Sequence, residues 1–210
     1  MEISFNLYHT KTRTTRKTAA QKKVAYLDKQ QALIAGCVAN NRATQRQLYE
    51  QYYSGMLSIC MRYAKNYEEA KDILSEGFMK VFKNIHKFEP RHSLASWIKR
   101  IMINTAIDHY RKNKKHNVQV DIEYAAHEAD VSSHSVLHRL SAAEIMKLVQ
   151  RLTPAYRTVF SLYVIEGYKH HEIATMLGVS EGTSKSNLAK ARAKLQYWIK
   201  TELPEYAYYG

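Results

Sequence analysis

Residues 183–194 combine two kinds of side chain that bind nucleic acids. At 100° per residue, one face of this stretch carries short polar groups near its start and cations further along. Hydroxyl and amide groups form hydrogen bonds with base edges, whereas Lys and Arg pair with phosphates. The residues that we expect to make such contacts are Thr183, Lys185, Ser186, Asn187, Lys190, Arg192 and Lys194. The alternative is an ordinary surface helix with a solvated, charged face.

The stretch around this face predicts a helix-turn-helix. Residues 170–177 and 181–198 both have helical periodicity, and Gly178 between them can take the positive φ that a sharp turn requires. Ser180 is a natural N-cap for the second helix. The side of that helix opposite its polar face carries Ser184, Leu188, Ala191 and Leu195. We therefore expect the polar face to enter the major groove of DNA.

Two carboxylates and a methionine share the outer face of a helix predicted over residues 67–85. The apolar side of this helix carries Ile73, Leu74, Phe78, Val81 and Ile85 at helical spacing. Asp72, Glu76 and Met79 lie on the other side. Carboxylates suit a basic partner surface, and a thioether adapts its shape to an interface. The alternative is a pair of acids on a solvated face.

Cations are interleaved with apolar groups on one side of the next predicted helix, residues 93–112. Its core side is expected to hold Leu94, Trp97, Ile98, Ile101 and Thr105. The opposite side carries Lys99, Arg100, Ile103, Asn104, Ile107, Tyr110 and Arg111. Such a set suits an unpaired DNA strand, because cations bind phosphates and apolar or aromatic groups contact base faces. The alternative is packing of one domain on another. Asp108 lies near the core side, which predicts an internal ion pair.

Charge and composition divide the chain into segments. The formal net charge of the 210 residues is +13, yet residues 116–138 hold four acids and no Lys or Arg. The scarcity of Gly and Pro and the lack of period-2 alternation predict an all-α chain of two small helical domains joined by a flexible acidic linker. We expect a basic arm without structure over 1–29, a helical domain over 30–115, the linker over 116–138 and a helix-turn-helix domain over 139–203.

No residues have the spacing of a catalytic or metal centre. The two histidines before Glu172 do not complete an HExxH motif, because Thr175 occupies the second His position. Cys37 and Cys60 form no CxxC pair and are interpreted as thiols. No apolar run is long enough to predict a membrane span. We expect no enzyme activity, no catalytic residue, no metal and no cofactor.

Three blocks of the sequence resemble a known family. In residues 152–195 the matching pieces are Leu152-Thr153-Pro154, Arg157-x-Val159-Phe160, Glu166-Gly167, Glu172-Ile173-Ala174, Gly182-Thr183, Lys185-Ser186 and Ala191-Arg192. In residues 93–112 they are Trp97-Ile98, Arg100-Ile101, Asn104, Ala106-Ile107-Asp108 and Arg111, and residues 68–88 match as a third block. Over roughly residues 30–200 the chain resembles bacterial RNA polymerase sigma factors of the extracytoplasmic-function (ECF) group. Asn187 stands where the family often has Arg.

The resemblance implies a role for each block. Core RNA polymerase would bind Asp72, Ile73, Glu76 and Met79 of the region 2 domain. The minus-ten promoter element would bind Lys87, Phe88, Arg91, Lys99, Arg100, Asn104, Tyr110 and Arg111, with the loop 87–93 capturing a flipped base. The minus-thirty-five element would bind Arg157, Thr183, Lys185, Ser186, Asn187, Lys190, Arg192 and Lys194 of the region 4 domain.

The resemblance also implies partners and a location. Core RNA polymerase, promoter DNA and an anti-sigma factor would bind a cytoplasmic protein that is a monomer when free and does not insert into the membrane. One alternative is a helix-turn-helix regulator that binds duplex DNA without being a polymerase subunit. Another is a DNA-processing enzyme, although none of the 16 Tyr residues lies in a recognisable catalytic motif.

Overall fold

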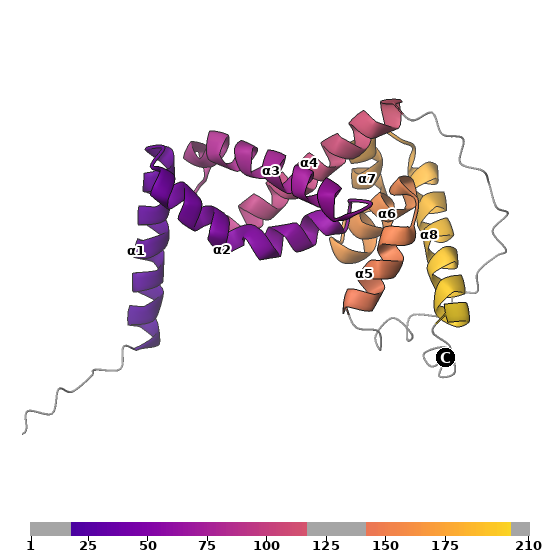
Figure 1. Cartoon of the computed structure of the whole chain (residues 1–210), viewed down its shortest axis with the longest axis horizontal. Helices are drawn as coiled ribbons and strands as arrows, with labels where there is room; N and C mark the ends of the chain where they lie inside the picture. The colour runs from indigo at the N-terminus through magenta and orange to yellow at the C-terminus, as the bar shows by residue number, and fades with distance from the viewer. Residues whose placement is uncertain (1–17, 117–141, 203–210) are drawn as a thin grey trace, which may run out of the picture.

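The computed structural model describes residues 18–116 and 142–202. Every regular element in these residues is a helix, which confirms the predicted all-α class. The first helical group comprises α1 (Ala19–Val38), α2 (Arg42–Met61), α3 (Tyr67–Asn84), the 3₁₀ turn η1 (Ile85–Lys87) and α4 (Leu94–His116). The second helical group comprises α5 (Ala142–Arg151), α6 (Pro154–Phe160), the π-helical η3 (Ser161–Ile165), α7 (His170–Leu177) and α8 (Glu181–Glu202). Figure 1 shows the two groups side by side, with α1 at the far end of the first.

Helix α1 begins inside the segment that was expected to lack structure. It starts at Ala19, so the expectation of an unstructured arm is wrong for residues 19–29, while residues 1–17 lie outside the described residues. The helix ends at Val38, and Asn40 takes a left-handed φ of 57°. The side chain of Asn41 then caps α2 by accepting a hydrogen bond from the Ala43 N–H at 2.9 Å. A helix break therefore occurs at these two asparagines.

Helices α3 and α4 pack closely because a glycine of one faces a methionine of the other. A Cβ atom at Gly77 would lie 2.3 Å from the Met102 sulfur, so the two helices come this close because Gly77 has no side chain. The predicted apolar side of α3 is buried, as are Leu94, Ile98 and Met102 of α4. Thr105 is also fully buried, and its hydroxyl donates to the Ile101 carbonyl at 2.8 Å. This packing leaves the charged sides of both helices facing outward.

The second helical group is assembled on one side of α8. Ser184, Leu188, Ala191 and Leu195 are all buried on that side. Pro154 occupies the first turn of α6, where its missing N–H costs nothing. Thr153 precedes it but is not a side-chain cap, because its buried hydroxyl has no hydrogen-bond partner among the described residues. A Thr directly before a Pro at a helix start predicts a side-chain cap, and this prediction is wrong for Thr153.

The two helical groups are in direct contact. Helix α4 packs on α7, and one hydrophobic cluster contains residues of both groups. The Ser161 hydroxyl donates to the Arg62 carbonyl at 2.9 Å. The Arg157 guanidinium donates to the Tyr63 carbonyl at 3.2 Å. Except for His116, the predicted acidic linker lies outside the described residues.

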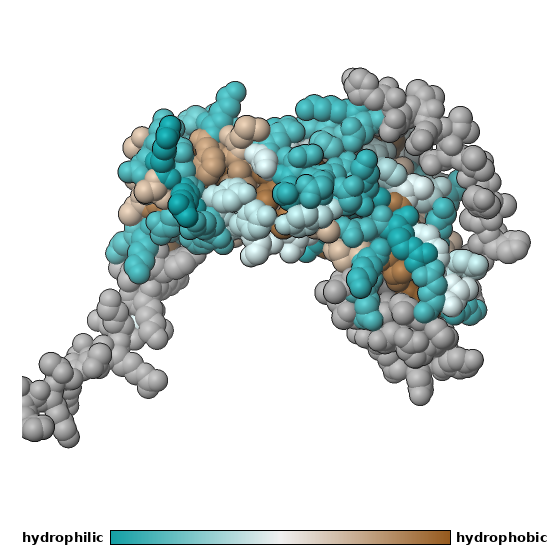
Figure 2. Space-filling view, viewed as in Figure 1, coloured by the Kyte–Doolittle hydropathy of each residue, from teal (hydrophilic) through white to brown (hydrophobic). Residues whose placement is uncertain are grey.

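The described surface is mainly polar. Hydrophilic side chains cover most of the face shown in Figure 2, and hydrophobic ones show through in small patches. Met79 is the notable exposed apolar residue of α3, with 65% of its surface accessible. Within the described ranges, no helix has both the length and the apolar character needed to cross a bilayer.

Both cysteines are buried free thiols. Burial raises the pKa of Cys60 to about 12, and it also raises the pKa of Cys37. A thiol with a raised pKa is a poor nucleophile, because the thiolate is the reactive form. Cys37 and Cys60 therefore act as small apolar side chains of the core.

Candidate functional site

The turn between α7 and α8 has the geometry of a helix-turn-helix. Gly178 ends α7 with φ 64° and ψ 47°, a left-handed conformation in which a side chain would be strained. The Ser180 hydroxyl accepts a hydrogen bond from the Thr183 N–H at 3.0 Å and so caps α8. At the start of α7, the Glu172 carboxylate accepts from the Lys169 N–H at 2.7 Å. These contacts fix how α8 projects from the second helical group.

The first two turns of α8 present polar groups to solvent. Thr183, Lys185 and Ser186 are exposed, and Asn187 is half-buried. The Lys185 side chain is 63% exposed and lies 3.7 Å from Glu181. The Thr183 hydroxyl shares a 2.9 Å hydrogen bond with the Ser180 hydroxyl. The structure therefore brings together the hydroxyl and amide groups that the sequence suggests for base contacts.

The cations further along α8 are half-buried, and two of them lie near aromatic rings of the same helical group. The Arg192 guanidinium lies 5.8 Å from the centre of the Tyr163 ring, and the Lys194 ammonium lies 5.6 Å from that of Tyr156. Lys190 is half-buried. Phosphate binding by these three residues stays a prediction.

Arg157 departs from the expected DNA surface. Only 3% of it is exposed, and its guanidinium donates to the Tyr63, Gln150 and Leu152 carbonyls at 3.2, 3.0 and 2.7 Å. In this arrangement Arg157 ties α6 to the end of α5 and to the first helical group. A cation in a motif does not show from sequence alone whether it meets phosphates or buried carbonyls.

The outer face of α3 exposes most of the residues expected to bind a partner. Met79 and Asp72 are exposed, and Glu76 is half-buried. Ile73 is the exception, because only 2% of it is accessible and it packs in the core. The expected contact of Ile73 with a partner therefore does not fit the structure, and its role is to support α3 from within.

The outer side of α4 is cationic and less apolar than predicted. Arg100, Asn104 and Arg111 are exposed, and Tyr110 is half-buried. Lys99 is half-buried in an ion pair with Glu166 of the second helical group. Ile103 and Ile107 are only 2% and 3% exposed, so the expectation that they face bases is wrong. Helix α4 packs against α2, α3 and α7, which buries a wider arc than one amphipathic stripe.

The loop between η1 and α4 contains one residue that the sequence misplaces. Phe88 is 9% exposed and packs edge-on against Trp97, with 5.7 Å between ring centres. It therefore supports the loop from below and offers no surface to a flipped base. Lys87 and Arg91 are exposed, as expected, and Arg91 pairs with Glu89.

Two family models match these two helical groups. Residues 48–116 match Sigma-70 region 2, and residues 142–195 match Sigma-70, region 4. The ECF RNA polymerase sigma factor SigW of Bacillus subtilis (strain 168) is 30% identical over 160 residues, covering 71% of this chain and 85% of SigW. The chain belongs to the ECF group of RNA polymerase sigma factors. This sigma factor therefore binds core RNA polymerase and promoter DNA and directs promoter-specific initiation of transcription.

Other proteins are similar to this sigma factor along most of its length. The ECF RNA polymerase sigma factor SigM of Mycobacterium tuberculosis (strain ATCC 25618 / H37Rv) is 28% identical, covering 78% of this chain and 81% of SigM. Among solved structures, the sigma factor RpoE in complex with the anti-sigma factor NepR from Bartonella quintana is 23% identical. That match has a TM-score of 0.44 and covers 74% of this chain and 96% of RpoE.

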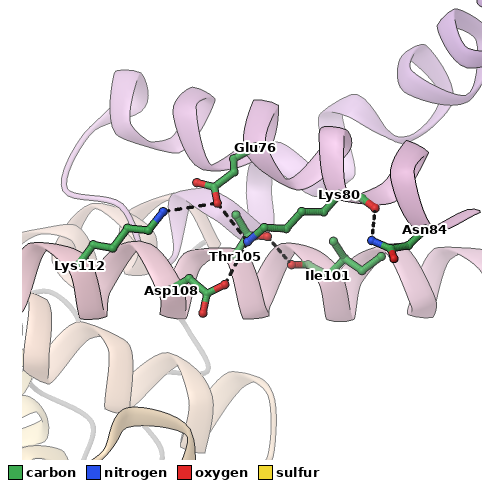
Figure 3. Close-up of polar contacts among 7 residues, drawn as sticks. All are labelled: Glu76, Lys80, Asn84, Ile101, Thr105, Asp108 and Lys112. Atoms are coloured by element: carbon green, nitrogen blue, oxygen red, sulfur yellow. Dashed lines mark hydrogen bonds and ion pairs between the residues drawn. The ribbon is translucent and has the colours of Figure 1, made fainter.

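An ion network joins the two helices of region 2 that carry the outer faces. The Lys80 ammonium lies 3.1 Å from Glu76 Oε1 and 3.0 Å from Asp108 Oδ2, and Lys112 approaches Glu76 to 3.8 Å (Figure 3). Asp108 thus forms an ion pair across α3 and α4, as expected, but its side chain is 45% exposed, so the expected position near the core is wrong. Sequence reasoning missed Lys80, although its spacing of four residues from Glu76 was a usable signal. Lys80 holds Glu76 against α3 and links it to α4.

Replacing Lys80 with Met should lower the free energy of unfolding of this sigma factor by about 1 kcal/mol, because Glu76 and Asp108 lose their shared cation. Urea denaturation measures the change. The matched control is Lys71→Met, which removes a more exposed pair with Glu68 on the same helix. Equal effects of the two substitutions would show that the Lys80 network adds no more stability than the exposed pair of Lys71 and Glu68.

The stability of the helix-turn-helix should depend on pH through His170. Its Nδ1 lies 2.9 Å from the Ser184 hydroxyl, and its ring stacks on Tyr163 with 4.4 Å between centres. Burial lowers the pKa of His170, as does the charge of Lys185, with a smaller contribution from Arg192, while Glu181 opposes the shift. The unfolded chain, with a His pKa of about 6.5, therefore takes up this proton first as the pH falls.

The contribution of His170 to stability should be complete above pH ~6.5 and lost as the pH falls below that value. Urea denaturation at a series of pH values checks this. We expect His170→Gln to flatten the pH dependence, and His86→Gln, at an exposed histidine of the first helical group, to leave it unchanged. If the free energy of unfolding of His170→Gln varies with pH as it does in the unmodified protein, His170 does not cause this pH dependence.

Proposed function

We propose that three helix faces of this sigma factor divide the work of initiation. The outer face of α3, with Asp72, Glu76 and Met79, binds core RNA polymerase. Exposed Met79 and two neighbouring carboxylates support this, because they offer an adaptable apolar contact beside negative charge. Lys80 and Lys112 hold Glu76 in a defined position at the edge of this face.

The outer side of α4 binds the unpaired strand of the minus-ten element. Its contact residues are Lys99, Arg100, Asn104, Tyr110 and Arg111, with Lys87 and Arg91 of the preceding loop. The cationic character of this side supports the proposal, since phosphates of a single strand pair with Lys and Arg while bases stack on Tyr. Because Phe88, Ile103 and Ile107 are buried, we assign base stacking to the half-buried Tyr110.

Helix α8 recognises the minus-thirty-five element in duplex DNA. Thr183, Ser186 and Asn187 contact base edges, and Lys185 contacts a phosphate. The capped, exposed N-terminal turns of α8 support this, because recognition helices of helix-turn-helix proteins use these turns for base contacts. The cations Lys190, Arg192 and Lys194 add phosphate contacts further along the helix.

Two domains, a linker and a regulatory partner complete this division of work. Residues 30–115 and 139–203 form the two working domains, with 116–138 as the acidic linker between them. The protein lends binding energy to the polymerase, has no catalytic site of its own and acts in the cytoplasm.

An anti-sigma factor binds it and holds it inactive, and the similar sigma factor RpoE, which forms a complex with the anti-sigma factor NepR, supports such a partner. Co-purification of the native complex tests this partner.

Run-off transcription on paired templates tests the division of work. One template is fully duplex, and the other carries a premelted minus-ten region. We expect Arg100→Ala to reduce transcription from the duplex template more than from the premelted one, and Lys185→Ala to reduce both. Lys200→Ala, at an exposed position near the end of α8, is the control. If Arg100→Ala reduces transcription equally from both templates, α4 does not take part in strand opening.

A further inference from the structure

Two cations of the first helical group converge on one carboxylate of the second. Arg62 Nη1 lies 2.8 Å from Glu166 Oε1, and the Lys99 ammonium lies 2.5 Å from Glu166 Oε2. The Glu166 side chain is 3% exposed, whereas those of Arg62 and Lys99 are 25% and 41% exposed. Each carboxylate oxygen therefore has its own cation, and the cluster forms a nearly closed ion site.

The cluster exists only while the two helical groups stay in contact. Arg62 directly follows α2 and Lys99 lies in α4, whereas Glu166 directly follows η3. The neighbouring Ser161 hydroxyl bonds the Arg62 carbonyl, so the carboxylate is delivered by the packing of η3 on the end of α2. If the groups separate, Arg62 and Lys99 are left side by side without an anion. Two adjacent cations without a counter-charge favour binding of another anion.

We propose that Arg62 and Lys99 form a phosphate site for the promoter strand, and that Glu166 fills this site while the two helical groups are packed together. The proposal rests on the proposed function of α4 in binding the minus-ten strand, and it adds Arg62 to that surface. Glu166 then acts as an internal substitute for a DNA phosphate. DNA and the packed arrangement exclude each other at this site.

The position of the site favours DNA as its occupant. Lys99 directly precedes Arg100, and Asn104 lies one turn further along α4, so the site continues the cationic side of that helix. A phosphate presents several oxygens and can meet an Arg and a Lys at once, as the Glu166 carboxylate does. The tethered carboxylate competes at a high effective concentration, so the packed form binds DNA weakly.

Binding of a fluorescent single-stranded oligonucleotide, containing the minus-ten sequence, to the full chain tests the proposal. Glu166→Gln keeps the side-chain shape and removes its charge. We expect it to tighten DNA binding about fivefold, because Arg62 and Lys99 both lose the competing carboxylate. Glu202→Gln, which makes the same change at the end of α8, should leave binding unchanged. Circular dichroism confirms that both variants are folded.

A second substitution distinguishes two explanations for tighter binding: a phosphate site at Arg62, or separation of the two helical groups without such a site. In the Glu166→Gln background, Arg62→Gln should reverse most of the gain and lower the salt slope of binding by about 0.7. If Glu166→Gln has no effect, or if Arg62→Gln changes neither affinity nor slope, the proposal is wrong. If a polyglutamate peptide shows the Arg62 dependence and the oligonucleotide does not, the site takes an acidic protein segment, and DNA is the wrong occupant.

One further variant distinguishes failure of this inference from failure of the proposed function. Arg100→Ala removes an exposed cation of α4 that has no part in the Glu166 cluster. If Arg100→Ala weakens binding of the oligonucleotide but Arg62→Gln does not, α4 binds the strand and the additional phosphate site is refuted. If neither substitution weakens binding, the minus-ten assignment of α4 fails as well.

Discussion

Run-off transcription with core polymerase should fall about tenfold when Asp72 is replaced by Lys, the loss expected for an interface residue worth about 1.4 kcal/mol. Asp72 is exposed on α3 beside Glu76 and Met79, so the substitution reverses the charge of the proposed docking face without entering the core. A like charge opposite a basic partner surface is repulsive and weakens the specific complex. Titration of labelled core polymerase should show the same loss of affinity.

The control for Asp72→Lys is Glu50→Lys on α2. Glu50 is an exposed acid paired only with Arg46 among the described residues, and its side chain is 60% exposed. The two variants carry the same net charge and should have similar melting temperatures, so a difference between them reports on the α3 face. If both transcribe equally, or if Asp72→Lys keeps full affinity for core polymerase, the polymerase contact lies elsewhere.

Lys185→Ala should weaken binding to minus-thirty-five duplex DNA about fivefold and lower the slope of log affinity against log salt by about one unit. The Lys185 side chain projects from the second turn of α8 and is 63% exposed, with only Glu181 at 3.7 Å as a partner among the described residues. Loss of a phosphate contact removes one released counterion. The effect should therefore be similar on different promoter sequences. Fluorescence anisotropy at several salt concentrations measures both quantities.

Lys200→Ala is the matched control for Lys185→Ala. It removes the same charge from the same helix, near the C-terminal end and outside the proposed contact set. Its salt slope should equal that of the unmodified protein. If both variants lower the slope equally, long-range charge and not a local phosphate contact explains the result. If neither does, α8 meets DNA through a different face.

Residue periodicity correctly predicts which residues are buried where a helix packs on one side only. In α8 the stripe from Ser184 to Leu195 is buried, and the polar residues opposite it reach solvent at the start of the helix. In α3 the same reasoning separates buried Phe78 from exposed Met79. Both results follow from the 3.6-residue repeat, which a sequence displays directly.

In α4 the periodicity predicts the wrong exposure for some residues, because several neighbouring helices bury this helix. Ile103 and Ile107 fall outside the predicted apolar stripe, yet both are buried, and α4 packs on α2 and α7 as well as on α3. Phe88 was misassigned for a related reason, since its partner Trp97 lies on the following helix. The exposure of such residues depends on elements that a local pattern does not contain.

The family, the all-α class and the polar faces of α3 and α8 follow from residue types and spacing, because helix periodicity is local. The partners of the charged groups follow only from tertiary structure. Arg157 and Lys99 are both cations in blocks that were expected to bind the promoter, yet one is bonded to buried carbonyls and the other to Glu166. Such partners come from distant parts of the chain, and packing alone determines which carbonyl or carboxylate lies within hydrogen-bonding distance.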